Sequence, residues 1–423
     1  MKNLLYIFVL VCCISFAQQT PGLKQSEAIT IIGATAHIGN GKVIDNSLLI
    51  LENGKLSLVA DATLTKVPYK GKVIDATGKH IYPGFIAPNA TLGLVEVDAV
   101  RASNDHREIG VYNPHIRSII AYNTESRVTE TLRPNGVLQA QIVPRGGRIS
   151  GTSSIVQLDA WNYEDALIKE NDGIHINWPR TFNRSGWWAE PGPTTPNKKY
   201  QEQINNLENF FTKAAHYDSK NGVDLKLESM LGTLDGSKKI FIHLEDEKQI
   251  IDAIHFGLKH KLNIVLVGAY DAHKTTNLLK KHNIPVLLQR VHSTPSNDDD
   301  DYDLPYKLAS KLVDAGILVG LETSGDMERM NSRNLPFYAG TCVGYGLDKE
   351  IAISLISLNT AKILGIDSFT GSLETGKDAT LFISEGDALD MRTNKLTHAF
   401  IQGRKISLES HQTELYQRYR NKK

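Results

Sequence analysis

The chain has 423 residues, and its 47 basic and 47 acidic side chains give a formal net charge of zero at pH 7. It has no basic face or block, which argues against a nucleic-acid-binding protein. The chain is long enough for a large hydrophobic core. With only three cysteines, we do not expect disulfides to be the main source of its stability. The acidic run at 298–301 is short and predicts a solvated loop. This composition favours an enzyme or a binding protein for small molecules.

The first 17 residues have the pattern of a secretory signal peptide. Lys2 precedes an apolar run over 4–16, which ends in the small-residue pattern Ser15-Phe16-Ala17. We expect cleavage before Gln18 and an exported protein, periplasmic or secreted. The apolar run is too short to span a bilayer, so we expect no membrane span. Cys342 would be the one cysteine of the mature chain, and we expect it to be buried.

Residues 28–80 predict a small β module. Strand-like apolar runs cover 28–32, 47–51 and 55–59. Asn53-Gly54, between the last two runs, is typical of a tight hairpin turn.

From residue 81 onward, strand-like runs alternate with helical patterns, which indicates a parallel α/β array. The predicted strands are 137–143, 240–244, 263–267, 285–288 and 317–321, and the predicted helices are 247–261, 272–282 and 306–315. This alternation alone fits either a (β/α)8 barrel or an open doubly wound sheet. The stretch 145–197 is rich in Gly, Pro, Trp and Asn, and we expect long loops there, with His175, Trp178, Trp187 and Trp188 forming an aromatic wall.

Several motifs resemble the amidohydrolase superfamily, in particular its imidazolonepropionase-like members. Residues 83–93, PGFIAPNATLG, resemble the first-strand signature P-G-x-I-D-x-H-x-H-x-G. Near the C-terminus, NTAKILG at 359–365 and GSLETGKDATL at 371–381 resemble N-P-A-x-x-L-G and G-S-L-E-x-G-K-x-A-D-L, and 398–406 matches the expected closing strand. The segments 91–101 and 145–154 also look like an exported subgroup that lacks the paired histidines.

The resemblance implies a fold and its domain boundaries. It implies a (β/α)8 TIM-like barrel over 81–365 and a small β-sandwich built from 18–80 and 366–423. Residues 1–17 would be the signal peptide, and long loops at about 145–197 would cover the barrel mouth.

The metal ligands of the family are replaced in this chain. The first-strand histidines fall on Asn89 and Thr91, and the strand-eight aspartate falls on Ser324, while His243 keeps the strand-five histidine. Zinc needs at least three good N, O or S donors. We therefore expect no cofactor, and zinc could bind only through a non-standard site of His243, Glu322 and Glu245.

The residues at the ends of the barrel strands are the candidates for function, because barrel enzymes keep their sites there. Glu322 and His243 are the candidate catalytic bases. The candidate substrate-binding residues are Asn89, Thr91, Arg145, Ser324 and His292. Arg145 opens a Gly-rich turn over 145–154 that either cradles an anionic group or is a plain turn.

Two functions agree with these residues. The first is a hydrolase acting on a non-peptide C–N bond of a small molecule, of the cyclic amide or modified dipeptide type. The second is a metal-free binding subunit that retains a small-molecule pocket and pairs with an active paralogue. A homodimer or such a hetero-oligomer would be its assembly.

Overall fold

The computed structural model describes residues 20–187, 189–325 and 327–422. The predicted signal peptide lies outside these residues. Within the described ranges, no helix has both the length and the apolar character needed to cross a membrane.

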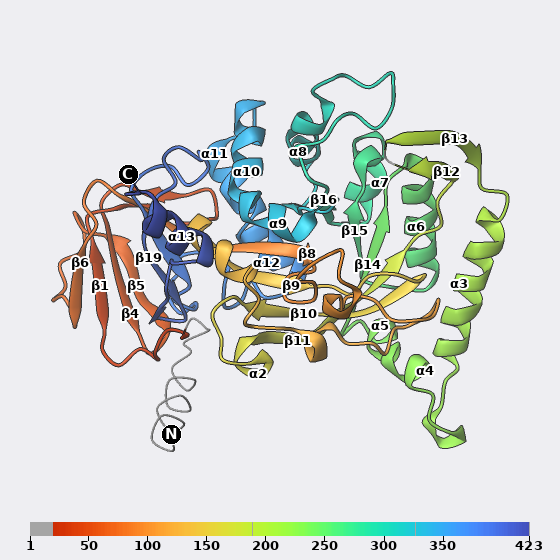
Figure 1. Cartoon of the computed structure of the whole chain (residues 1–423), viewed down its shortest axis with the longest axis horizontal. Helices are drawn as coiled ribbons and strands as arrows, with labels where there is room; N and C mark the ends of the chain where they lie inside the picture. Colours follow the sequence, from red (N-terminus) through yellow and green to blue (C-terminus); the bar gives the residue numbers. More distant parts are fainter. Residues whose placement is uncertain (1–19, 188, 326, 423) are drawn as a thin grey trace, which may run out of the picture.

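An eight-stranded sheet curves into a nearly closed barrel at the centre of the molecule (Figure 1). Its strands, in spatial order, are β8 (Phe85–Ala90), β9 (Val137–Ile142), β10 (Ile149–Gln157), β11 (Leu167–Asn177), β14 (Lys239–Leu244), β15 (Ile264–Gly268), β16 (Val286–Leu288) and β17 (Val319–Leu321). All neighbours are parallel except β10, which runs antiparallel to β9 and β11. The predicted α/β barrel is confirmed.

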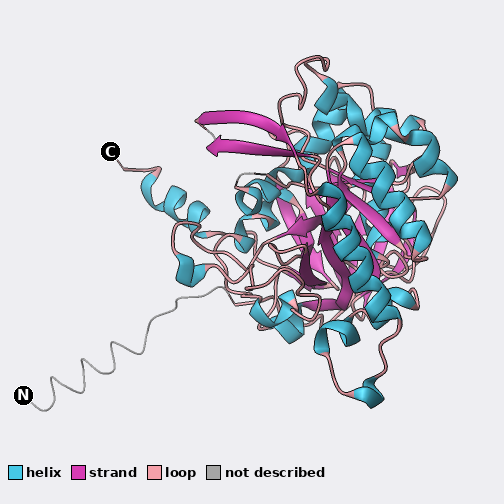
Figure 2. Ribbon diagram, turned by 90° about the vertical axis from the view of Figure 1, so that its right-hand side faces the viewer, coloured by secondary structure: helices cyan, strands magenta, loops and turns pink. Residues whose placement is uncertain are grey.

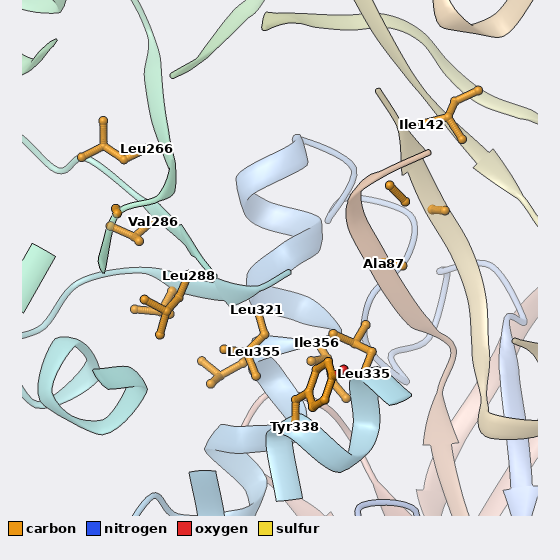
Figure 3. Close-up of a cluster of buried hydrophobic side chains, with 14 of the residues drawn as sticks. Ala87, Ile142, Leu266, Val286, Leu288, Leu321, Leu335, Tyr338, Leu355 and Ile356 are labelled. Carbon is orange, nitrogen blue, oxygen red and sulfur yellow. The ribbon is translucent and has the colours of Figure 1, made fainter. Parts of the chain in front are cut away.

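Helices cover the outside of the barrel. They are α6 (Glu247–Lys259), η6 (Tyr270–Lys274), α7 (Thr276–Lys281), α8 (Leu304–Asp314), α10 (Leu335–Gly344), α11 (Lys349–Leu355) and α12 (Leu358–Leu364). Helix α6 begins at a capping box of Asp246 and Gln249 and buries Ile250 and Ile254 against the sheet. Figure 3 shows Leu288 of β16 and Leu321 of β17 in a cluster of buried hydrophobic side chains that also contains residues of the later helices. The helices and strands predicted in this region are confirmed, with ends shifted by a few residues.

The remaining helices are short or peripheral. They are α2 (Tyr163–Ala166), α3 (Tyr200–Ala215), α4 (Leu225–Ser229), α5 (Leu231–Leu234), α9 (Glu328–Asn331) and α13 (His411–Tyr419). Single 3-10 turns are η1 (Arg101–Ser103), η2 (Ser118–Ala121), η3 (Thr129–Thr131), η4 (Arg133–Asn135), η5 (Ser219–Asn221) and η7 (Ser332–Asn334).

Two smaller sheets pack against each other beside the barrel, and one of them combines strands from both ends of the chain (Figure 1). One contains β5 (Lys55–Asp61), β4 (Ser47–Glu52), β1 (Ile29–Ile32) and β6 (Lys72–Asp75); the other contains β20 (Arg404–Lys405), β19 (Leu396–Ile401), β18 (Leu381–Ser384), β7 (His80–Pro83), β2 (Thr35–His37) and β3 (Val43–Ile44). The hairpin turn between β4 and β5 is confirmed, because Asn53 and Gly54 have φ of 52° and 78°.

The loops predicted over 145–197 are wrong. Strands β10 and β11 of the barrel occupy much of this stretch, and β12 (Phe182–Trp187) and β13 (Glu190–Pro196) form a hairpin that projects from the body (Figure 2). His175 is fully buried on β11 and Trp178 is buried after it, while Trp187 is exposed. These residues therefore form no continuous aromatic wall; Trp188 lies outside the described residues.

The core between the two small sheets makes a testable prediction. Phe400 is fully buried in this core, between residues from both ends of the chain. Phe400→Ala should lower the free energy of unfolding by about 3–5 kcal/mol, because it leaves a large cavity. Urea unfolding followed by circular dichroism measures this change.

The matched control is Val73→Ala on β6, because Val73 is 46% exposed. Its expected effect is within about 0.5 kcal/mol. A loss for Phe400→Ala as small as that of the control would contradict the packing described here.

Candidate active site

A cavity of about 450 Å³ lies at the carboxyl ends of strands β14 to β17. His243 and Glu322 both line it, as do Ser324 and Gln289. The hairpin contributes Phe182 and Arg184 to its wall, and the remaining lining residues include Arg180, Glu245, Asp246 and Asp271. This is the end of a barrel at which enzymes of this fold carry their active sites.

Glu322 follows strand β17, and its carboxylate is held by three donors. It accepts hydrogen bonds from the Ser324 backbone N–H and hydroxyl, both at 2.5 Å, and from the Asn89 amide at 3.3 Å. Its side chain is fully buried, and this burial raises its pKa to about 7, although the bonds from Ser324 act in the opposite direction. Glu322 can therefore take up or release a proton near neutral pH.

Asn89 connects Glu322 to a cation. It ends β8 with a left-handed φ of 53°, and Arg145 donates to its side-chain oxygen at 2.8 Å and to its backbone oxygen at 2.7 Å. The positive charge of Arg145 favours the ionised form of Glu322 and disfavours protonation of His243. Arg145 thus places a permanent positive charge at the end of the first barrel strand.

His243 is a neutral imidazole at physiological pH. Its pKa is lowered to about 3, mainly by burial and then by the charge of Arg145. Its Nε2 lies 2.8 Å from Nδ1 of His175, whose Nε2 lies 2.9 Å from the Ser153 hydroxyl. Burial also lowers the pKa of His175 well below its usual range.

Four predicted substrate-binding residues do not line this cavity: Asn89 and Arg145, which contact Glu322 or lie behind it, and Thr91 and His292. Thr91 donates its backbone N–H and its hydroxyl to Glu328, and it does not line the cavity. His292 lines a separate cavity of about 310 Å³, where its Nε2 lies 2.6 Å from the Thr341 hydroxyl. His292 is therefore left out of the site that we propose below.

The Gly-rich turn uses its polar groups within the protein. Arg145 binds Asn89, and Arg148 donates to the backbone oxygen of Asn177. The Asn177 amide in turn donates to the carbonyl groups of Gly146 and Gly147. Cys342 is buried as predicted, and burial raises the pKa of its thiol to about 12.

Strands β9 to β11 carry a buried polar group that was not predicted from the sequence. It contains Gln141, Ser153, Asp172 and His175, all at most 2% exposed. These small polar residues give their segment the composition of a loop. Their spacing carried a signal nonetheless, since His175 and Asn177 are two residues apart and β strands place such residues on one face.

The donor groups of the site do not fit a zinc ion. Nε2 of His243 is bonded to His175, so His243 offers only Nδ1 to the cavity; both carboxylate oxygens of Glu322 already accept hydrogen bonds, and the nearby charge of Arg145 is positive. Zinc needs at least three N, O or S donors. Within the described ranges, no group of three or more His, Cys, Asp or Glu side chains is arranged to hold a metal.

A comparison with models of known protein families finds no match. An imidazolonepropionase of Flavobacterium psychrophilum is 29% identical over 263 residues, which are 57% of this chain and 62% of that protein. One of Flavobacterium johnsoniae is 25% identical over 160 residues, 34% of this chain and 39% of that protein. The chain therefore spans less than two thirds of either relative.

Among solved structures, an amidohydrolase of Thermotoga maritima MSB8 superposes with a TM-score of 0.77 and 23% identity, covering 90% of this chain and 99% of that one. This chain has the fold of an amidohydrolase. It is imidazolonepropionase-like in sequence. A phenylurea hydrolase B superposes more loosely, with a TM-score of 0.55 and 13% identity over 90% of this chain and 97% of that one, which shows a likeness of fold.

The buried carboxyl group of Glu322 predicts a pH-dependent stability. Its pKa is about 7 in the folded protein against a reference of 4.5. The stability it contributes is present below pH 4.5 and is lost as the pH rises through 7. A shift of this size corresponds to a loss of up to about 3 kcal/mol, at roughly 1.4 kcal/mol per pH unit.

Glu322→Gln should remove this loss, because an amide does not ionise. Urea unfolding at pH 5 and pH 8 should show that wild type loses more stability than the variant between the two values. Glu202→Gln, at an exposed position on α3, should behave like wild type. A pH dependence identical in wild type and Glu322→Gln would show that Glu322 does not titrate in this range.

Proposed function

We propose that this protein is a hydrolase that cleaves a non-peptide C–N bond of a small molecule in the cavity at the barrel mouth. The observation that carries the proposal is Glu322, a buried carboxyl group that borders the cavity and has a pKa of about 7. Shifts of this kind are typical of catalytic acids and bases. The imidazolonepropionases among its relatives support a cyclic amide as substrate, with a modified dipeptide as the second type to test.

Glu322 would act first as a base and then as an acid. In its ionised form it accepts a proton from a water molecule that attacks the substrate carbonyl carbon. The same proton is then available to the nitrogen that leaves when the C–N bond breaks. His243 stays neutral and offers a second polar contact to the water or the substrate.

Asn89, Ser324 and Arg145 would position this carboxylate. Asn89 and Ser324 donate to its oxygens, which fixes the orientation of the group. Arg145 holds Asn89 in place through two hydrogen bonds. Because the donor groups do not fit zinc, the proposal includes no metal cofactor.

The cavity suits a small polar ligand. Its volume of about 450 Å³ lies within the usual range for small-molecule sites. Cationic side chains, Arg180 and Arg184, and acidic ones, Glu245 and Asp246, share its wall. Such a wall complements a substrate that carries both donors and acceptors.

The setting and assembly of the protein are part of the same proposal. The pattern of the first 17 residues supports export to the periplasm or the medium. The balanced charge supports a small-molecule partner rather than nucleic acid. A homodimer, or a hetero-oligomer with a paralogue that carries the paired histidines, is the assembly to test.

A panel of cyclic amides and N-acylated or cyclic dipeptides tests the activity directly. The kcat/KM of a hydrolysed compound should rise with pH through about 7, as Glu322 ionises. Glu322→Gln should lower kcat by roughly 10²-fold or more, the usual contribution of a general base. Ammonia or amine release, followed by mass spectrometry, measures turnover.

The matched control is Glu202→Gln, which changes an exposed carboxylate on α3 away from the cavity. It should keep kcat near wild type. Full activity of Glu322→Gln would remove Glu322 from the site. Compounds that bind in calorimetry without turnover would instead favour the binding subunit.

A further inference from the structure

A chain of buried polar side chains leads from the interior of the barrel to the cavity. Asp172 accepts from the Ser153 hydroxyl at 2.7 Å, Ser153 lies 2.9 Å from Nε2 of His175, and Nδ1 of His175 lies 2.8 Å from Nε2 of His243. Asp172, Ser153 and His175 are each at most 2% exposed. At these distances every link is a full hydrogen bond.

The acceptors around Ser153 determine which atom donates in each hydrogen bond of this buried series. A hydroxyl has one proton, and Ser153 faces two acceptors, the Asp172 carboxylate at 2.7 Å and the Gly173 carbonyl at 3.1 Å. Donating to either of them leaves the Ser153 oxygen as an acceptor for His175. Gln141 supports this arrangement, since its amide N–H donates to the second oxygen of Asp172 at 2.8 Å.

The tautomers of both histidines follow from these donor and acceptor roles. His175 must carry its proton on Nε2 to donate to Ser153, so its Nδ1 is an acceptor. His243 must then carry its proton on Nε2 to donate to His175, so its own Nδ1 is an acceptor as well.

Nδ1 of His243 is open to the cavity. His243 lines the cavity, and among the described residues its Nδ1 has no hydrogen-bond partner and is not enclosed by protein. A ligand proton in the cavity can therefore reach a lone pair whose position the buried chain fixes.

We propose that Asp172 and Ser153, acting through His175, are positioning residues that hold His243 as its Nε2–H tautomer and present Nδ1 to the cavity as a hydrogen-bond acceptor. The effect of this acceptor on turnover rests on the proposed hydrolase function, whereas the tautomer itself does not. A role limited to packing would leave the tautomer of His243 undetermined.

Long-range proton–nitrogen NMR of protein labelled with 15N-histidine tests the tautomer directly. The wild-type signals of His175 and His243, assigned with His175→Gln and His243→Gln, should both show the Nε2–H pattern at pH 7. A wild-type His243 in the Nδ1–H form would overturn the proposal, whether or not Ser153→Ala and Asp172→Asn fold.

Ser153→Ala tests whether the buried hydrogen-bonded series determines the tautomer of His243. It removes the acceptor of His175, so His175 should shift its proton to Nδ1, and His243 should then appear as Nδ1–H. Thr152→Val is the matched control, because Thr152 is a buried neighbour on β10 whose hydroxyl donates to the Pro114 carbonyl instead. Its spectrum should match wild type, and an unchanged His243 tautomer in Ser153→Ala would overturn the proposal. Asp172→Asn provides a second test if Ser153→Ala does not fold, and should likewise lower the Nε2–H fraction of His243.

Activity adds a separate result. If the chain is a hydrolase, Ser153→Ala should lower kcat by at least about tenfold with KM within about twofold, since general acid–base groups contribute 10²–10⁴-fold. If no compound is hydrolysed, the proposed function fails while the tautomer measurement still decides this inference.

Discussion

The placement of one positive charge organises the mouth of this barrel. The guanidinium of Arg145 binds the side chain and the backbone of Asn89, and its field acts on the buried carboxylates Glu322 and Glu328. A charge taken out of water is costly unless it is paired and hydrogen-bonded. Arg145 is hydrogen-bonded to Asn89 and acts on the two carboxylates through its field, so removing its charge would leave both carboxylates without that stabilisation.

The two candidate catalytic groups are connected through the barrel wall. Glu322 contacts Asn89, the backbone N–H of Asn89 donates to Gln141, and the Gln141 amide donates to Asp172. From Asp172 the contacts continue to His243 through Ser153 and His175. Buried polar networks of this kind hold a unique geometry only when every member is satisfied. The site is therefore a property of six strands, β8 to β11, β14 and β17, and single changes within it should affect groups on both sides of the cavity.

The sequence predicted an alternation of strands and helices because these elements repeat a regular apolar pattern, whereas the closure into a barrel was predicted from the family resemblance. Strands β14 to β17 are short apolar runs between amphipathic helices, and such runs are readable without a structure. Strands β10 and β11 were missed because their buried positions hold Ser153, Ser154 and Asp172, residues that propensity assigns to loops. Hydrogen bonds to residues distant in the sequence satisfy these buried polar side chains. A single sequence does not reveal such partners.

The contrast between local sequence patterns and long-range contacts also explains which site residues could be predicted. Glu322, His243 and Ser324 follow from strand ends, so the structure places them around one cavity. His292 follows strand β16 too, but its chain turns toward α10 and a different cavity. Ser153 and Asp172 act through contacts across strands that are distant in sequence, which no local pattern encodes.

We propose that the positive charge of Arg145 acts on Glu322 and that the site works without a metal ion. Elemental analysis of the protein, purified without chelator and again after incubation with zinc, tests it most directly. The account predicts far less than one metal ion per chain in both preparations, and turnover that is unchanged by a chelator. About one tightly bound ion per chain, with activity lost on its removal, would contradict it and would mean that His243 and Glu322 ligate a metal.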